Sequence, residues 1–149
     1  MKAPSYKTFR HSSERASQSL ALVKATETKC ERLLRSALWR MGFRYRKNVR
    51  DLPGRPDIVF RRHRVVVFCD GDFWHGRNWP HRRKRLKRGA NASYWVAKIR
   101  ANMQRDKRHN TELRRLGWTV MRLWELDILA DTQKAASAIA QELSRNRRQ

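Results

Sequence analysis

The stretch DIVFRRHRVVVFCD, residues 57–70, decides the fold, because two short apolar runs flank a charged break. The runs DIVF and VVVF are rich in β-branched and aromatic residues, which favour strands. The break RRHR is short enough for a hairpin connection. With His63 and Arg64 as the two turn residues, the strands pair antiparallel and Asp57 lies opposite Asp70 on one face of the sheet.

Further elements are predicted on both sides of this pair. Apolar residues at helical spacing, together with capping and stop residues, predict helices at 26–41 with Thr26 as N-cap, at 93–116 before Gly117, and from the cap Asp131 to 143. Strands are predicted at 43–49 and 118–124, and a polar, basic loop at 76–91. This order of elements indicates an α/β fold with one central mixed sheet flanked by helices.

The charge of the chain points to a polyanionic partner. The 149 residues include 36 Lys and Arg against 13 Asp and Glu, a formal charge of +23. Nucleic acid is the leading partner class and an anionic membrane surface the weaker one. Cys30 and Cys69 form no CxxC pair, which argues against a disulfide framework and fits a reducing cytoplasm. The length favours one folded domain, residues 25–144, between a basic N-terminal arm at 1–24 and a basic tail at 145–149. The arm is either a flexible tail or a segment that lies along a DNA groove.

Acidic side chains and a histidine gather around the end of the second apolar run. Two carboxylates on one face, Asp57 and Asp70, repel each other and would gain from a bound divalent cation such as Mg²⁺. The alternative for either residue is an ion pair with a nearby arginine. Glu31 lies on the apolar side of the first helix and is either a third acid of the site or an ion-pair partner of Arg35. His75 is a candidate acid or base, because its ordinary pKa is near neutrality.

The motifs LPGRPD, DGDFWHG, SYWVAKIRANMQRD and LGWTVMRLWE together resemble the very short patch repair (Vsr-type) endonucleases, over about Thr26 to Glu125. The resemblance implies a restriction-endonuclease-like three-layer fold. It also implies Mg²⁺-dependent nicking of one DNA strand at or beside a T:G mismatch, with one or two metal ions, in a bacterial cytoplasm close to the nucleoid.

The resemblance also implies roles for residues of the site. Asp57 would bridge the metal ions, and the backbone carbonyl of Cys69 would be a further ligand. His75 would take part in proton transfer, Asp106 would orient it, and Glu31 matches the family's glutamate in the first helix. Phe73 and Trp74 would wedge into the base stack. DNA contacts are further predicted for Arg55 and for the basic segment, namely Arg82, Arg83, Lys84, Arg85, Lys87 and Arg88.

The chain departs from the family pattern at two places. Asp70 stands where the best-known member has a histidine, so we expect Asp70 to be a direct or water-mediated metal ligand. Family members carry a zinc site of three cysteines and a histidine, whereas the matching residues here are Asp72, Arg77, Trp79 and Leu126. We therefore expect no zinc.

These inferences lead to a metal-dependent DNA endonuclease that acts as a monomer, with a repair or defence protein as a possible recruiting partner. Two alternatives stay open. One is a nicking nuclease of the same fold that acts on foreign, modified or branched DNA. The other is a DNA-binding protein that has lost catalysis.

Overall fold

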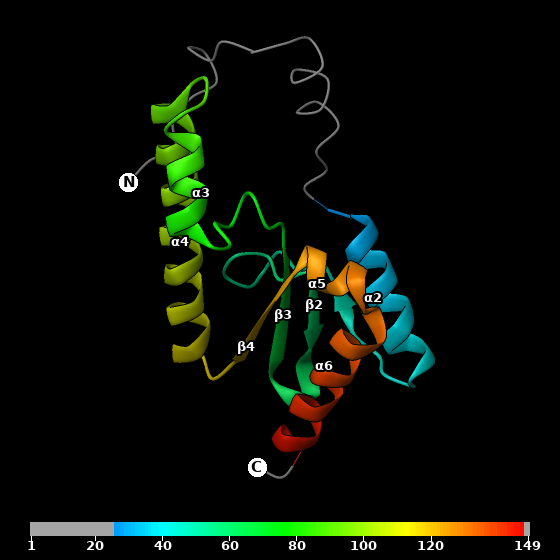
Figure 1. The fold of residues 1–149 in the computed structure, drawn as a ribbon. Coiled ribbons are helices and arrows are strands. Elements are labelled where there is room, and N and C mark those ends of the chain that lie inside the picture. Colours follow the sequence, from blue (N-terminus) through cyan, green and yellow to red (C-terminus); the bar gives the residue numbers. More distant parts are fainter. Residues whose placement is uncertain (1–25, 148–149) are drawn as a thin grey trace.

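The computed structural model describes residues 26–147 and shows a four-stranded mixed sheet with helices on both faces (Figure 1). The predicted arm at 1–24 and the last residues of the predicted tail lie outside the described range. The sheet order is β1-β2-β3-β4, with bounds Arg46–Lys47, Ile58–Phe60, Val65–Asp70 and Thr119–Trp124. The first two pairings are antiparallel, and β3 pairs parallel with β4.

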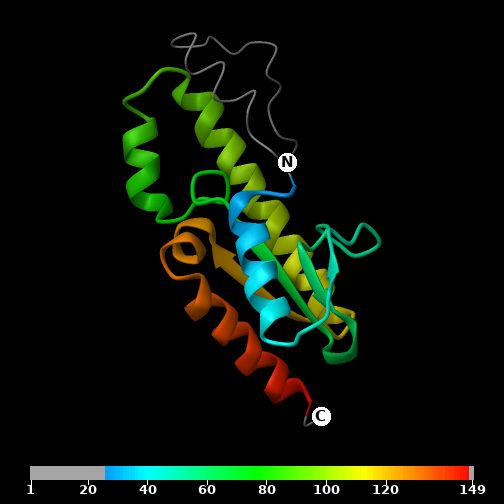
Figure 2. The same ribbon diagram turned by 90° about the vertical axis from the view of Figure 1, so that its right-hand side faces the viewer.

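Two helical layers enclose the sheet (Figures 1 and 2). One layer holds α2 (Lys29–Arg40), α5 (Glu125–Ala130) and α6 (Thr132–Asn146); the other holds α4 (Ala92–Arg115) with α3 (Trp79–Leu86) beside it. Each face has its own core: Leu34, Ile58, Val67 and Ile139 belong to the first, and Val59, Phe68, Leu113 and Trp118 to the second. This arrangement confirms the α/β, restriction-endonuclease-like fold class expected from the sequence.

Side-chain caps fix where the flanking helices begin. The N-cap of α2 is Thr28, whose hydroxyl accepts from the backbone N–H of Glu31 at 3.4 Å, so the predicted cap at Thr26 was two residues early. Asp131 is confirmed as the cap of α6, because its carboxylate accepts from the N–H of Lys134 at 3.0 Å.

The register of the central hairpin differs from the prediction. Phe60 pairs with Val65, and the connection is a 3₁₀ turn over Arg61–His63 followed by Arg64 in the left-handed region at φ 56°. Continued by one residue, this register places Asp57 opposite Phe68, so the predicted pairing of Asp57 with Asp70 was wrong. The difference arises because four residues form the connection, not two. The shift is an even number of residues, so each side chain keeps its predicted face.

Three segments have a different structure from the one predicted. The basic segment predicted as a loop contains the helix α3, which the sequence pattern missed because its exposed Arg and Lys side chains carry no apolar stripe. The short helix α5 was not predicted. The first strand is limited to Arg46–Lys47, because Asn48 adopts a positive φ of 48° and interrupts it. Within residues 26–147, every helix is too short or too polar to cross a membrane.

Candidate active site

Several of the predicted site residues meet where the parallel strands β3 and β4 end. Asp70 is the last residue of β3 and pairs with Trp124, the last residue of β4. The loop that carries His75 leaves the sheet at this edge, and α4 runs beside it (Figure 1). Side chains alternate along β3, so Asp70 shares the face of Val66 and Phe68, which pack in the core under α4. The carboxylate of Asp70 therefore faces α4 and is buried.

A group of two acids and one histidine forms the centre of the site, with one acid hydrogen-bonded to the histidine and the other within ion-pair distance. Nδ1 of His75 lies 2.5 Å from Oδ2 of Asp106 on α4 and 3.6 Å from Oδ1 of Asp70. Potential ligand atoms of these three residues all lie within 4.8 Å of one another, close enough to contact one ion. The backbone carbonyl of Trp74 accepts from the buried amide of Asn102, which fixes the chain just before His75.

The electrostatics of this group favour a charged pair between His75 and Asp106. Burial lowers the pKa of His75, but the hydrogen bond to Asp106 and the charges of Asp70 and Asp106 outweigh that effect and raise it overall. Burial would raise the pKa of Asp106, but the bond to His75 and nearby cations hold it below its usual value. The pKa of Asp70 is raised, chiefly by burial.

Asp57 is the acid whose environment most favours an additional cation. Its Oδ2 accepts the backbone N–H of Cys69 at 2.7 Å, which joins it to the end of β3. Burial, followed by the negative charges of Glu31 and Asp70, raises the pKa of Asp57 to about 7, against the lowering effects of the Cys69 bond and of His75. A carboxylate deprived of water and close to other acids gains from a divalent cation, so these oxygen donors fit one.

Glu31 lies near Asp57 but outside the cluster formed with His75. Its carboxylate accepts the backbone N–H of Glu27 at 2.9 Å, and Nη1 of Arg35 lies 3.6 Å away. The alternative reading of Glu31 as an ion-pair partner of Arg35 thus has a structural basis, although Arg35 is closer to Glu27, at 2.6 Å. Burial raises the pKa of Glu31. The charge of Glu31 still acts on the site through the pKa of Asp57.

An aromatic cluster borders the site. Phe73 and Trp74 have ring centroids 5.2 Å apart, and Trp95 of α4 lies 5.3 Å from the first and 5.7 Å from the second. Tyr94 packs on Trp95 at 5.1 Å. All four are partly exposed. The sequence pointed to Phe73 and Trp74 but gave no reason to place Trp95 beside them, because Trp95 follows Trp74 by 21 residues in the chain.

Asp72 and Arg77, two of the four positions expected to match the family's zinc ligands, form an ion-pair network. Arg77 donates to Oδ2 of Asp72 at 2.9 Å and lies 3.0 Å from a carboxylate oxygen of Asp127. The other oxygen of Asp72 accepts the backbone N–H of Leu126 at 3.0 Å. The buried carboxylate of Asp72 thus joins the loop after β3 to the start of α5 through hydrogen bonds.

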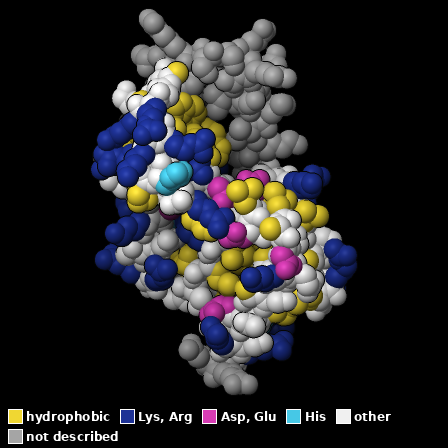
Figure 3. All heavy atoms as spheres, in the orientation of Figure 1, with side chains coloured by type: hydrophobic (Ala, Val, Ile, Leu, Met, Phe, Trp, Pro, Cys, Tyr) yellow, Lys and Arg dark blue, Asp and Glu magenta, His cyan; other side chains and the backbone are white. Residues whose placement is uncertain are grey.

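Basic side chains cover the surface next to the site. Lys and Arg gather over α3 and the neighbouring part of α4 (Figure 3), and the predicted DNA contacts of the basic segment lie on or directly after α3: Arg82, Arg83, Lys84, Arg85, Lys87 and Arg88. The guanidinium of Arg82 lies 5.4 Å from the ring centre of Phe73, which links this surface to the aromatic cluster. Arg55 is exposed in the turn before Asp57, at a positive φ of 53°.

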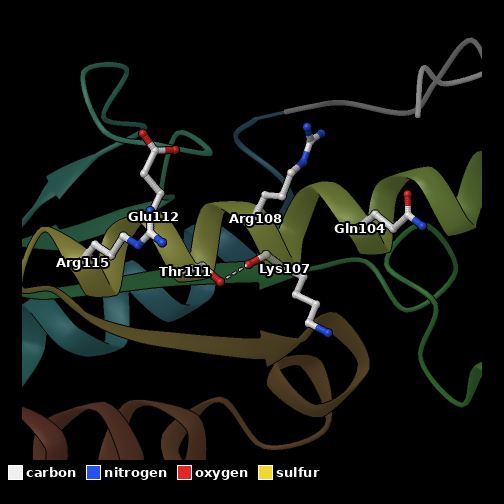
Figure 4. Close-up of a pocket in the computed structure, with 6 residues that line it drawn as sticks. All are labelled: Gln104, Lys107, Arg108, Thr111, Glu112 and Arg115. Atoms are coloured by element: carbon white, nitrogen blue, oxygen red, sulfur yellow. Dashed lines mark hydrogen bonds between the residues drawn. The ribbon is translucent and has the colours of Figure 1, made fainter.

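A hollow runs along the outer face of α4 (Figure 4). The described residues that line it are Gln104, Lys107, Arg108, Thr111, Glu112 and Arg115. At 100° per residue, Gln104 and Arg108 lie on the side of the helix opposite Asp106, so this hollow is separate from the acids.

Comparisons with known proteins show which proteins this chain is similar to. The family described as "DNA mismatch endonuclease Vsr" matches residues 9–81. A relative from Haemophilus parainfluenzae, the type II nicking enzyme V.HpaIIP, is 44% identical over 107 residues, which cover 72% of this chain and 74% of the relative. The type II nicking enzyme V.NmeDIP of Neisseria meningitidis serogroup C is 40% identical over 79% of this chain and 78% of its own. The DNA mismatch endonuclease Vsr of Escherichia coli K12 is 31% identical, with 89% and 83% covered.

The fold and these relatives define a strand-nicking DNA endonuclease. The chain belongs to the Vsr family of DNA mismatch endonucleases. The resemblance identified from its motifs is confirmed, and with it the enzyme class and DNA as the substrate class.

Proposed function

We propose that this protein nicks one strand of duplex DNA at or beside a T:G mismatch, in a Mg²⁺-dependent reaction of very short patch repair. The observation that supports this best is the convergence of Asp57, Asp70, His75 and Asp106 at one strand tip, next to an aromatic cluster and a basic surface. A DNA-binding protein without catalysis would need no such cluster of acids at one strand tip.

In this proposal Asp57, Asp70 and the backbone carbonyl of Cys69 hold the metal. A divalent cation there would supply Lewis-acid polarisation of the scissile phosphate. Three oxygen donors leave room for water, in keeping with the preference of Mg²⁺ for a partly hydrated shell. Glu31 adds negative charge behind Asp57 and strengthens the attraction for the cation.

His75 is the proposed proton acceptor. Its Nδ1 is engaged by Asp106, which leaves Nε2 to receive a proton from the attacking water. Asp106 holds the ring and favours the imidazolium that forms. The nearby acids raise the pKa of His75, so the neutral, accepting form grows in as the pH rises above the ordinary histidine range.

Phe73 and Trp74 are proposed to unstack the base step beside the mismatch, with Trp95 supporting both rings from α4. The cations on and after α3, with Arg55, are proposed to neutralise phosphates. These contacts give affinity without sequence information and make binding depend steeply on salt. We propose a monomer as the acting form, with any repair or defence protein serving only to recruit it.

A second function is favoured by one observation. Relatives at 44% and 40% identity are type II nicking enzymes, and the loop after β3 is joined by Asp72 and Arg77 where zinc ligands would stand. The second candidate function is therefore the same nicking reaction on a second target class, namely foreign, modified or branched DNA.

The test is cleavage of supercoiled plasmid and of matched T:A and mismatched T:G duplexes, each with Mg²⁺ or EDTA. The wild type is expected to nick with Mg²⁺ and to prefer T:G, whereas Asp57→Ala is expected to be inactive. Asp51→Ala is the matched control, since Asp51 is exposed and pairs only with Arg61 among the contacts of the described residues. Equal cleavage of both duplexes would favour the second target class, and cleavage in EDTA would refute the metal-dependent mechanism.

A further inference from the structure

Arg122 lies directly beneath the acids of the site, although its sequence position gives no sign of this. It stands next to Phe68 across the parallel β3–β4 pair, and its guanidinium lies 4.0 Å from the centre of the Phe68 ring. Nη1 donates to both oxygens of Asp70, at 3.0 and 3.1 Å. Nε donates to the side-chain oxygen of Asn110 on α4 at 2.7 Å. Three neighbours therefore fix the guanidinium in place.

The remaining nitrogen of Arg122 indicates that burial of this guanidinium carries a cost. Nη2 is buried and has no hydrogen-bond partner among residues 26–147. A buried donor without a partner carries a free-energy penalty, so its presence needs a reason. The arrangement brings Nη1 within 3.8 Å of Asp106 as well as within hydrogen-bonding distance of Asp70. One cation thus lies between the two acids that contact His75.

The same contacts exclude a direct role for Arg122 in holding a DNA phosphate. Its face is covered by Phe68, two of its nitrogens are engaged by Asp70 and Asn110, and the third is buried. A phosphate could reach this guanidinium only after those contacts broke. Arg122 therefore acts on the site through the acids it touches.

We propose that Arg122 is a positioning residue that fixes the oxygens of Asp70 and offsets the charge that Asp70 adds to the metal site. The proposal rests on the divalent-metal site of the proposed function. A histidine at position 70 would be neutral, whereas Asp70 introduces an anion; Arg122 returns the local charge to nearly the same value. The pair still leaves lone pairs on Asp70 for a metal ion or its water, since each carboxylate has about four acceptor sites.

The test is the affinity of the metal-free, full-length protein for Mn²⁺ without DNA, measured by titration calorimetry. Arg122→Met removes the cation and keeps much of the side-chain volume. A unit charge within about 8 Å of a divalent ion changes its affinity by about tenfold or more, so Arg122→Met is expected to bind Mn²⁺ at least about tenfold more tightly. Nicking by the same variant is expected to be slower, because Asp70 is no longer held. Arg122→Lys keeps the charge and is expected to keep an affinity close to that of the wild type.

Arg64→Met is the matched control. The Arg64 guanidinium also lies over an aromatic ring, 4.6 Å from the centre of Trp118, and donates to the backbone oxygen of Leu116, but it contacts none of the acids of the site. Its Mn²⁺ affinity is expected to be unchanged.

Should Arg122→Met fail to fold, Asp70→Asn compared with the double variant Asp70→Asn/Arg122→Met gives the same comparison without leaving Asp70 as a buried anion deprived of its partner. The double variant is expected to bind Mn²⁺ more tightly than Asp70→Asn. Equal or weaker binding after loss of Arg122, in either background, would overturn the proposal while the metal site itself stands. Failure of the proposed function itself would give a different result. If the proposed metal site is wrong, Asp57→Ala would bind Mn²⁺ as tightly as the wild type.

Discussion

Replacing Asp57 by asparagine should stabilise the metal-free protein at neutral and alkaline pH. Burial, and then the charges of Glu31 and Asp70, raise the pKa of Asp57 from its ordinary 3.8 to about 7. The folded state therefore holds this proton more tightly than the unfolded state does, so ionisation of the carboxyl opposes folding. A difference of about three pKa units, at about 1.4 kcal/mol each, sets a ceiling of about 4 kcal/mol on that destabilisation.

The direction of the pKa shift determines at which pH the wild type loses stability. Below about pH 4 the carboxyl is protonated in both states, and the wild type loses nothing. Between about pH 4 and 7 the unfolded state releases its proton first, and the wild type loses stability as the pH rises; above that window the loss is constant. The substitution removes the charge alone, since asparagine keeps an oxygen that can accept the N–H of Cys69. In the wild type this N–H donates to Oδ2 of Asp57 at 2.7 Å.

Urea unfolding in EDTA, at about pH 5 and about pH 8, measures the effect. Asp57→Asn is expected to raise the free energy of unfolding by about 2–4 kcal/mol at the higher pH and by less at the lower one. Asp51→Asn is the control, because Asp51 is exposed and pairs with Arg61 at the surface. Mg²⁺ should narrow the difference by stabilising the wild type. An Asp57→Asn protein no more stable than the wild type at about pH 8 in EDTA would refute the reasoning.

Three further predictions concern other parts of the site. Asp106→Asn removes the main contact that raises the pKa of His75, so the acidic limb of the pH–rate profile for nicking should move to lower pH. The maximal rate should fall by about 10²-fold. An acidic limb at the same pH as in the wild type would contradict the role of His75 as base. Arg85→Gln should weaken binding to all duplexes alike and reduce the slope of log affinity against log salt by about one, measured by fluorescence anisotropy; an unchanged slope would place Arg85 away from phosphate. Asp72→Ala should lower the free energy of unfolding by about 2 kcal/mol, because the N–H of Leu126 loses its partner. An increase in the stability of either the wild type or the variant on addition of Zn²⁺ would contradict the expectation that this loop binds no zinc.

Local sequence patterns were sufficient for most of the fold. The β-branched runs identified β2 and β3, and the capping carboxylate of Asp131 identified the start of α6, because both signals depend on neighbouring residues alone. The register of the hairpin could not be read in this way. The left-handed residue Arg64 sets it, and no glycine or asparagine marked that position. Helix α3 was missed because its stability depends on its contact with α4 and not on an apolar stripe of its own.

The candidate site was predictable to the extent that its residues are close in sequence or belong to a family motif. Asp70 and His75 lie in one short segment, and the motif resemblance linked them to Asp106, which the structure places 2.5 Å from the histidine. Arg122 and Asn110 carried no comparable signal. An arginine in a strand is typical of a solvated position, and only the parallel pairing of β3 with β4 brings this one under Asp70.

The charges of the chain separate DNA binding from catalysis. Of the 13 acids in the chain, Glu31, Asp57, Asp70 and Asp106 act on one strand tip, whereas 36 Lys and Arg carry the opposite charge. A DNA phosphate is attracted to the basic surface but repelled by these acids, so the site admits it only when the negative charge is compensated. Arg122, and His75 when it is protonated, would compensate part of it from within the protein. The negative charge that remains would attract a divalent cation, and one such cation would neutralise it. In the proposed mechanism the metal ion would therefore both polarise the phosphate and allow it to approach.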